Sequence, residues 1–130
     1  MLSREEIDKN YSKLKQLAQD MKNEYDFLYD VKRELGRVQK DISDLRIELI
    51  KEANDKEKHP ELKNAEMRES WIKENIKEKE LTEKRLSKEE EIMQREGRIK
   101  GIECEFRAIR IILETEAQLV ATLYGKEKGW

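Results

Sequence analysis

The chain has 130 residues, of which 28 are Lys or Arg and 30 are Asp or Glu, so 45% of it is charged although its formal net charge is only −2. The charged fraction of globular domains is about 25%. Because no run of about 18 apolar residues is present and the first residues lack an apolar segment, we expect no transmembrane helix and no secretory signal. One cysteine and one histidine exclude an intramolecular disulfide and an ordinary Cys/His zinc site. The composition predicts a cytoplasmic, mostly helical protein with no membrane partner.

The first segment is expected to form one helix over about residues 3–53. It begins at a capping box, in which the side chains of Ser3 and Glu6 can each accept a hydrogen bond from the other residue's backbone amide. A heptad repeat follows, and eleven of its fourteen a and d positions are apolar, which predicts a coiled-coil seam. Glu24 at a d position needs a basic partner or access to water. The fourteen positions, which we call the heptad seam, are Ile7, Asn10, Leu14, Leu17, Met21, Glu24, Leu28, Val31, Leu35, Val38, Ile42, Leu45, Leu49 and Glu52.

A polar break over residues 54–60 separates this helix from a second one. Pro60 ends the break and is favoured in the first turn of a following helix, where its missing amide would be unpaired anyway. The second helix is expected over about 61–124, with a frayed tail over 125–130. The chain 1–130 is therefore predicted to be a single elongated all-α domain, a long helical hairpin or coiled coil.

The apolar pattern of the second helix is uneven. Residues 99–123 continue a heptad with one polar residue among eight positions, whereas the same frame over 74–95 has two apolar residues among seven. A shifted frame recovers four apolar residues there, but it also includes charged ones. Ser87 opens a second capping-box signature, so a kink near residue 87, giving three helices, stays open as an alternative. The apolar residues of the shifted frame are Ile72, Ile76, Leu86 and Met93.

The mismatch between the two helices predicts self-association. Folding back would set the regular seam of residues 21–38 opposite the broken pattern of 76–93, which would leave part of the seam uncovered. Exposed apolar surface costs about 25 cal/mol per Å². We therefore expect an obligate homo-oligomer. Its expected interface residues are Leu14, Met21, Leu28, Val31, Leu35, Val38, Ile42, Phe106, Ile109 and Leu113.

No group of residues is typical of a catalytic site. His59 stands alone in the polar break and is expected to be a solvated loop residue. Cys104 lies outside the a and d positions, and no base accompanies it that could activate it as a nucleophile. The run Glu89–Glu91 is typical of a solvated helix face. The sequence therefore predicts a protein that is not an enzyme and holds no cofactor or metal.

Basic side chains form two ribbons that could contact nucleic acid. Arg33, Arg37 and Lys40 follow the i, i+4, i+7 spacing of one helix face. Nearby aromatic residues could stack on single-stranded bases. In the alternative interpretation, the ribbons arise by chance and pair with neighbouring acids such as Glu34 and Asp41. The second, looser ribbon comprises Lys84, Lys88, Arg95 and Arg98, and the aromatic residues are Tyr25, Tyr29 and Trp71.

The order of these segments resembles a known family. A long helix and a short polar loop precede Asn64–Glu69, which opens a second helix that closes with Ile102–Leu113. Over about residues 40–120 this pattern resembles small helical phage proteins of the UvsY-type recombination mediators, which load a recombinase onto single-stranded DNA covered by its binding protein. The resemblance implies a helical, oligomeric protein that binds single-stranded DNA. The contacts it implies are Lys51, Lys56, Lys58, Lys63 and Arg68.

Three functions follow as hypotheses. The first is a phage-type recombination mediator or oligomeric adaptor that binds single-stranded DNA, with a recombinase or a single-strand-binding protein as its partner. The second is a coiled-coil structural or interaction protein, such as a phage scaffold or an inhibitor of a host system. The third, a prefoldin-like holdase, would need small strands between the helices, and residues 54–60 have no strand pattern.

Overall fold

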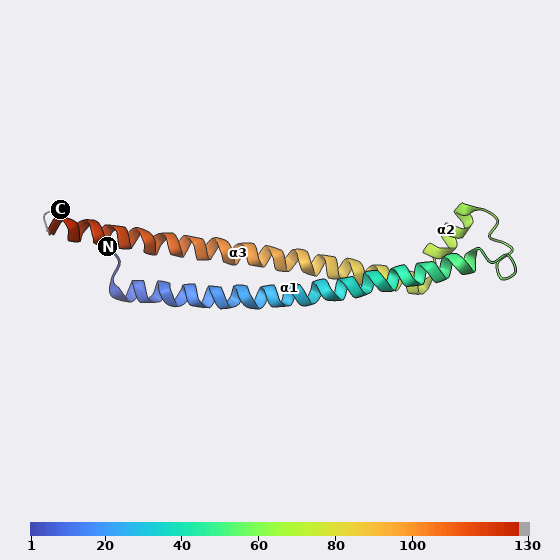
Figure 1. Cartoon of the computed structure of the whole chain (residues 1–130), viewed down its shortest axis with the longest axis horizontal. Coiled ribbons are helices and arrows are strands. Elements are labelled where there is room, and N and C mark those ends of the chain that lie inside the picture. Colours follow the sequence, from blue (N-terminus) through green and yellow to red (C-terminus); the bar gives the residue numbers. More distant parts are fainter. Residues whose placement is uncertain (128–130) are drawn as a thin grey trace. The chain divides into compact units, whose positions relative to one another are not determined.

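A computed structural model describes residues 1–127, and over these residues it contains three helices and no strand (Figure 1). Helix α1 spans Arg4–Ala53, α2 spans Ala65–Lys73 and α3 spans Ile76–Glu127. The predicted all-α hairpin is confirmed, because the two long helices α1 and α3 pack against each other.

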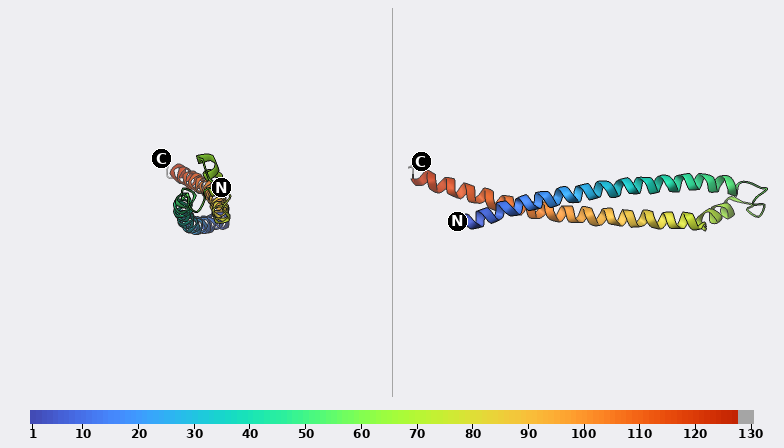
Figure 2. Two further views of the ribbon diagram at one scale, coloured as in Figure 1. Left: turned by 90° about the vertical axis from the view of Figure 1, so that its right-hand side faces the viewer. Right: turned by 90° about the horizontal axis from the view of Figure 1, so that it is seen from below.

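The chain divides into two compact units. The terminal unit comprises Met1–Phe27 and the chain from Arg95 on, and the loop unit comprises Leu28–Gln94. Both long helices contribute to both units. Within the terminal unit, the first part of α1 runs antiparallel to the last part of α3 (Figure 2).

The capping box at the start of α1 is confirmed. The Ser3 amide donates to Glu6 Oε2 at 3.3 Å, and the Glu6 amide donates to Ser3 Oγ at 3.1 Å. Further along the terminal unit, the Tyr25 hydroxyl donates to Glu103 Oε1 at 2.9 Å, which fixes the antiparallel pairing of the helices.

The partner that Glu24 requires is Arg95 on α3. The Arg95 Nη1 atom donates to Glu24 Oε2 at 3.1 Å, and both side chains are about four-fifths buried, at 18% and 19% exposed. The basic partner expected for a carboxylate at a d position is therefore present within the same chain.

In the loop unit, charged residues of α3 cover the heptad seam of α1. Glu78 is buried and accepts from Arg46 Nη2 at 2.7 Å, and Lys88 pairs with Glu34 at 2.5 Å. Arg85 and Lys88 are half-buried. Long basic side chains can cover apolar surface with their carbon stems while the charged ends reach outward. Basic residues that interrupt the apolar pattern of α3 can therefore still pack against the heptad seam of α1.

The expectation of a half-covered seam is therefore wrong. All ten residues predicted to form an oligomer interface are buried or half-buried within the single chain, so the seam does not require a second chain to cover it. The fully buried ones are Leu28, Val31, Val38, Ile42 and Leu113, and the half-buried ones are Leu14, Met21, Leu35, Phe106 and Ile109.

The boundaries of the second helical segment differ from those expected. Residue 61 lies in turns, α2 begins only at Ala65, and the chain breaks again at Glu74 and Asn75. The structure has three helices, but the break lies at Glu74 and Asn75 and not near residue 87, where α3 runs without interruption. The shifted frame is wrong as well, since its α3 residues are exposed. These residues are Ile76, Leu86 and Met93.

Two asparagines explain where the helices begin. The Asn64 side chain accepts from the Met67 amide at 2.9 Å, and Asn75 Oδ1 accepts from the Glu78 amide at 3.2 Å. Asparagine is among the best residues at this capping position because its short side chain reaches a free amide of the first turn. At the other end, α3 continues through Gly125 to Glu127. The rest of the tail predicted to be frayed, 128–130, lies outside the described residues.

Candidate nucleic-acid interface

A small apolar cluster anchors the polar break to the end of α1. Leu49 and Ala53 on α1 and Ile72 on α2 are buried against one another. Leu62 and Trp71 pack on this cluster from the loop and from α2. The loop is therefore packed against the end of α1 through Leu62.

Asp55 shapes the first turn of the loop. Its Oδ1 atom accepts from the amides of Glu57 at 3.0 Å and Lys58 at 3.4 Å, and its carbonyl accepts from the His59 amide at 2.9 Å. An aspartate that binds backbone amides two and three residues ahead stabilises a turn without regular structure. This turn leads the chain from α1 back toward α2.

The loop encloses a cleft of about 370 Å³ whose walls are basic. Lys56, Lys63 and Arg68 line it, and none of the described residues that line it is acidic. Arg68 is half-buried and donates through Nη1 to the Leu62 carbonyl at 3.4 Å. Within residues 1–127, none of the three cations forms an ion pair. The cleft therefore gathers three of the five cations implied by the resemblance, and none of the three is held in a salt bridge within the described residues.

His59 lies in the same cleft and is bound on both sides. Its Nδ1 atom lies 3.0 Å from Glu61 Oε1 and its Nε2 atom lies 3.3 Å from Glu52 Oε1, and its ring centroid is 4.7 Å from that of Trp71. The hydrogen bond to Glu61, followed by the one to Glu52, raises the pKa of His59 above its ordinary 6.5. In turn the hydrogen bond from His59 lowers the pKa of the Glu61 carboxyl.

The expectation that His59 is a solvated loop residue is therefore wrong, because its side chain is only 19% exposed. Sequence reasoning missed its role in joining α1 to the loop. Glu52, seven positions before His59, and Glu61, two after it, could have indicated this role. They reach the imidazole ring only because of the turn at Asp55. Trp71, one of the aromatic residues considered for base stacking, lies against His59, with the two ring planes inclined at 53°.

The first basic ribbon lies on the exposed face of α1. Arg33, Arg37 and Lys40 are all exposed, and the Arg33 guanidinium lies 5.8 Å from the centre of the Tyr29 ring. Lys51 follows Arg33 by 18 residues, which is five helical turns or ~27 Å, so the two share one face of the helix. This face belongs to the same loop unit as the cleft.

Glu34 forms its ion pair with α3 and not with this ribbon, although it also interacts electrostatically with Arg37. It pairs with Lys88 across the interface, and the hydrogen bond from Lys88 lowers the pKa of the Glu34 carboxyl. In the second basic ribbon, Lys88 and Arg95 form ion pairs with residues of α1, whereas Lys84 and Arg98 are exposed. Lys58 is exposed on the loop but does not line the cleft, and Tyr25 donates to Glu103.

No family model, curated protein or solved structure matches the chain. Over residues 1–127, no helix combines the length and apolar character needed to cross a bilayer. Within that same range, no three His, Cys, Asp or Glu side chains converge as metal ligands.

Proposed function

We propose that this protein binds single-stranded nucleic acid through the basic cleft of the loop unit and acts as an adaptor in recombination. The observation that carries the proposal is the set of three cations, Lys56, Lys63 and Arg68, around one cleft with no acidic residue among its lining. Cationic side chains held close together are suited to phosphate groups, because each contact releases condensed counterions from the strand.

The exposed face of α1 extends this surface. Arg33, Arg37, Lys40 and Lys51 supply further phosphate contacts, and the Tyr29 ring, 64% exposed, offers a plane on which a base can stack. With a formal net charge of −2 the chain has no bulk attraction for a polyanion, so binding depends on these local groups of cations.

Binding through phosphate contacts does not depend on the nucleotide sequence of the strand, and a recombination mediator needs binding of this kind. Contacts to phosphate position a protein on a strand without reading bases. A recombinase or a single-strand-binding protein is the expected partner, and joining several copies would multiply the weak contacts of each one.

The test is fluorescence anisotropy with a labelled single-stranded oligonucleotide between roughly 50 and 200 mM salt. We expect Lys56→Gln, Lys63→Gln and Arg68→Gln together to weaken binding and to flatten the plot of log affinity against log salt by about 2, because each single-strand phosphate contact contributes about 0.7. The matched control changes three exposed lysines of the terminal unit to Gln and should leave the slope nearly unchanged. These lysines are Lys9, Lys15 and Lys22.

Two results would refute the proposal: no binding at the lowest salt, or equal losses in the two triple variants. Either one would favour the alternative function, a coiled-coil structural or interaction protein such as a phage scaffold or an inhibitor of a host system. That alternative is supported by apolar side chains on the exposed surface of α3, among them Ile111, Ile112 and Leu119.

A further inference from the structure

Helix α3 extends past the start of α1. The Leu2 amide donates to Glu116 Oε1 at 2.9 Å, and α1 begins only two residues later, at Arg4. Because the helices are antiparallel, α3 from Ala117 on extends past the residue that contacts Leu2, at the start of α1. We call Ala117–Gly125 the overhang.

The overhang differs in composition from the rest of the chain. Its nine consecutive residues are all uncharged, in a protein that is 45% charged. Four of its large apolar side chains are about half exposed. In a protein this rich in charge, a helix surface exposed to solvent is expected to carry charged residues. The absence of charge over these nine residues therefore indicates a contact surface. The four residues are Leu119 (47% exposed), Val120 (46%), Leu123 (44%) and Tyr124 (52%).

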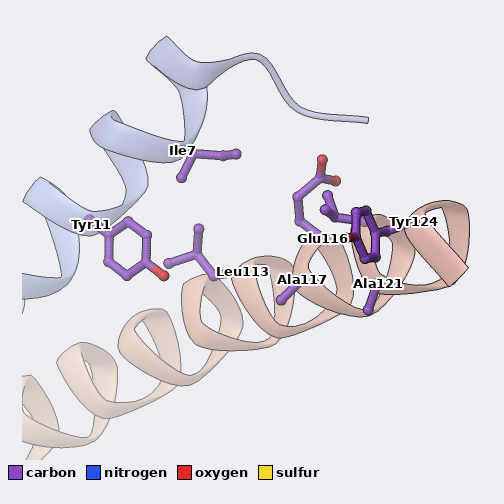
Figure 3. Close-up of a pocket in the computed structure, with 8 residues that line it drawn as sticks. Ile7, Tyr11, Leu113, Glu116, Ala117, Ala121 and Tyr124 are labelled. Atoms are coloured by element: carbon purple, nitrogen blue, oxygen red, sulfur yellow. The ribbon is translucent and has the colours of Figure 1, made fainter. Parts of the chain in front are cut away.

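The overhang also continues an interface that is already formed. The α3 heptad that packs on α1 includes Ile99 and Leu113, and the same frame reaches Val120 and Leu123 beyond the end of α1. A groove of about 440 Å³ follows this line, from Ile7 across Leu113 toward the overhang (Figure 3). The groove is lined by Ile7 and Tyr11 of α1 and continues along Ala117, Val120 and Ala121 of the overhang.

We propose that the overhang of a second copy of this chain occupies the groove, forming a two-fold symmetric antiparallel dimer. The occupant must be a helix with an apolar stripe in the same heptad frame, and every copy of the chain carries one. The overhang has no charge that would repel its own copy, and Ala117 and Ala121, spaced by one turn, let two helices approach closely. A two-fold contact requires such a self-complementary surface.

A second copy fits this surface better than a bilayer does. The nine residues of the overhang span ~14 Å as a helix, whereas the hydrocarbon core of a bilayer is about 30 Å thick. Self-association is therefore proposed at the end of α3 and not at the heptad seam, where the sequence alone predicted it. It is independent of nucleic-acid binding, so either proposal can fail without the other.

The test measures the mass of the full-length protein by sedimentation equilibrium over a wide concentration range. We expect a species of twice the 15.6 kDa chain mass, and we expect Val120→Asp with Leu123→Asp to raise its dissociation constant by at least about 100-fold. Circular dichroism should show unchanged helicity, because neither residue belongs to the buried core. The control is Met93→Asp, on the same helix, whose side chain is 73% exposed and which should leave the dimer intact.

A cysteine placed at the proposed two-fold axis tests the geometry. In a Cys104→Ser background, Ala121→Cys should form an intermolecular disulfide faster than Ala108→Cys, an exposed position of α3 outside the overhang. A monomer at every concentration, a dimer that tolerates both aspartates, or equal rates for the two cysteines would each overturn the proposal.

Discussion

The ion pair between Glu24 and Arg95 offers the sharpest test of how the two long helices are held together. We consider the substitution Arg95→Met, which keeps an unbranched side chain but removes the guanidinium. The Glu24 carboxylate then stays at a d position, 19% exposed, without the Nη1 atom that lies 3.1 Å from it. The guanidinium also lies 4.7 Å from the centre of the Phe27 ring, so this contact is lost too.

The expected loss in the free energy of unfolding follows from the burial of the ion pair. Removing one partner of a fully buried ion pair costs about 3–5 kcal/mol, because a charge is left in a poorly solvated place. Since each side chain here keeps about a fifth of its exposure, we expect the free energy of unfolding to fall by ~2–3 kcal/mol. The cation–π contact adds only ~0.5 kcal/mol, because the Phe27 side chain is half exposed.

The second variant combines Glu24→Leu with Arg95→Met, so that both positions of the ion pair become apolar. Replacing a buried ion pair by apolar residues is often neutral or stabilising by about 1–4 kcal/mol. The double variant should therefore be at least as stable as the original protein. Urea unfolding followed by circular dichroism measures all three proteins, and Arg107→Met, at an exposed arginine of the same unit, is the control with an expected change within ~0.5 kcal/mol. Single and double variants of equal stability would show that the carboxylate is solvated and the reasoning wrong.

Three further predictions concern single residues. Asn64→Ala removes the cap of α2 and should lower the stability of the loop unit by about 1 kcal/mol, measured by urea unfolding through Trp71 fluorescence in a Trp130→Phe background. The raised pKa of His59 contributes stability that is complete below pH 6.5 and is lost as the pH rises through the folded-state pKa, so the melting temperature should fall over this window, and His59→Ala should remove that part of the pH dependence. Gly36→Ala should stabilise α1 by about 0.5–1 kcal/mol in thermal unfolding, because no atom lies within 4 Å of the position of the added methyl group; a loss of stability would contradict the helix geometry at that site.

The sequence by itself determined the features that depend on local order along the chain. The heptad of α1, its capping box and the need of Glu24 for a basic partner follow from residue spacing, because a helix repeats every 3.6 residues whatever it packs against. The exposed basic ribbon at Arg33 and Arg37 was predictable for the same reason. The basic cleft was implied only by a resemblance, which named its cations without indicating that three of them share one cavity.

Only the tertiary structure decided how the uneven part of α3 is used. In sequence Glu78 and Lys88 interrupt the apolar pattern, but once α3 packs antiparallel to α1 they reach Arg46 and Glu34 and cover the seam. The same folding back places Glu116 at the Leu2 amide, so that α3 extends past the start of α1. These outcomes depend on which residues meet across the hairpin. That register appears in contacts between residues far apart in the chain, such as Tyr25 with Glu103 and Arg46 with Glu78, and the spacing within either helix does not contain it.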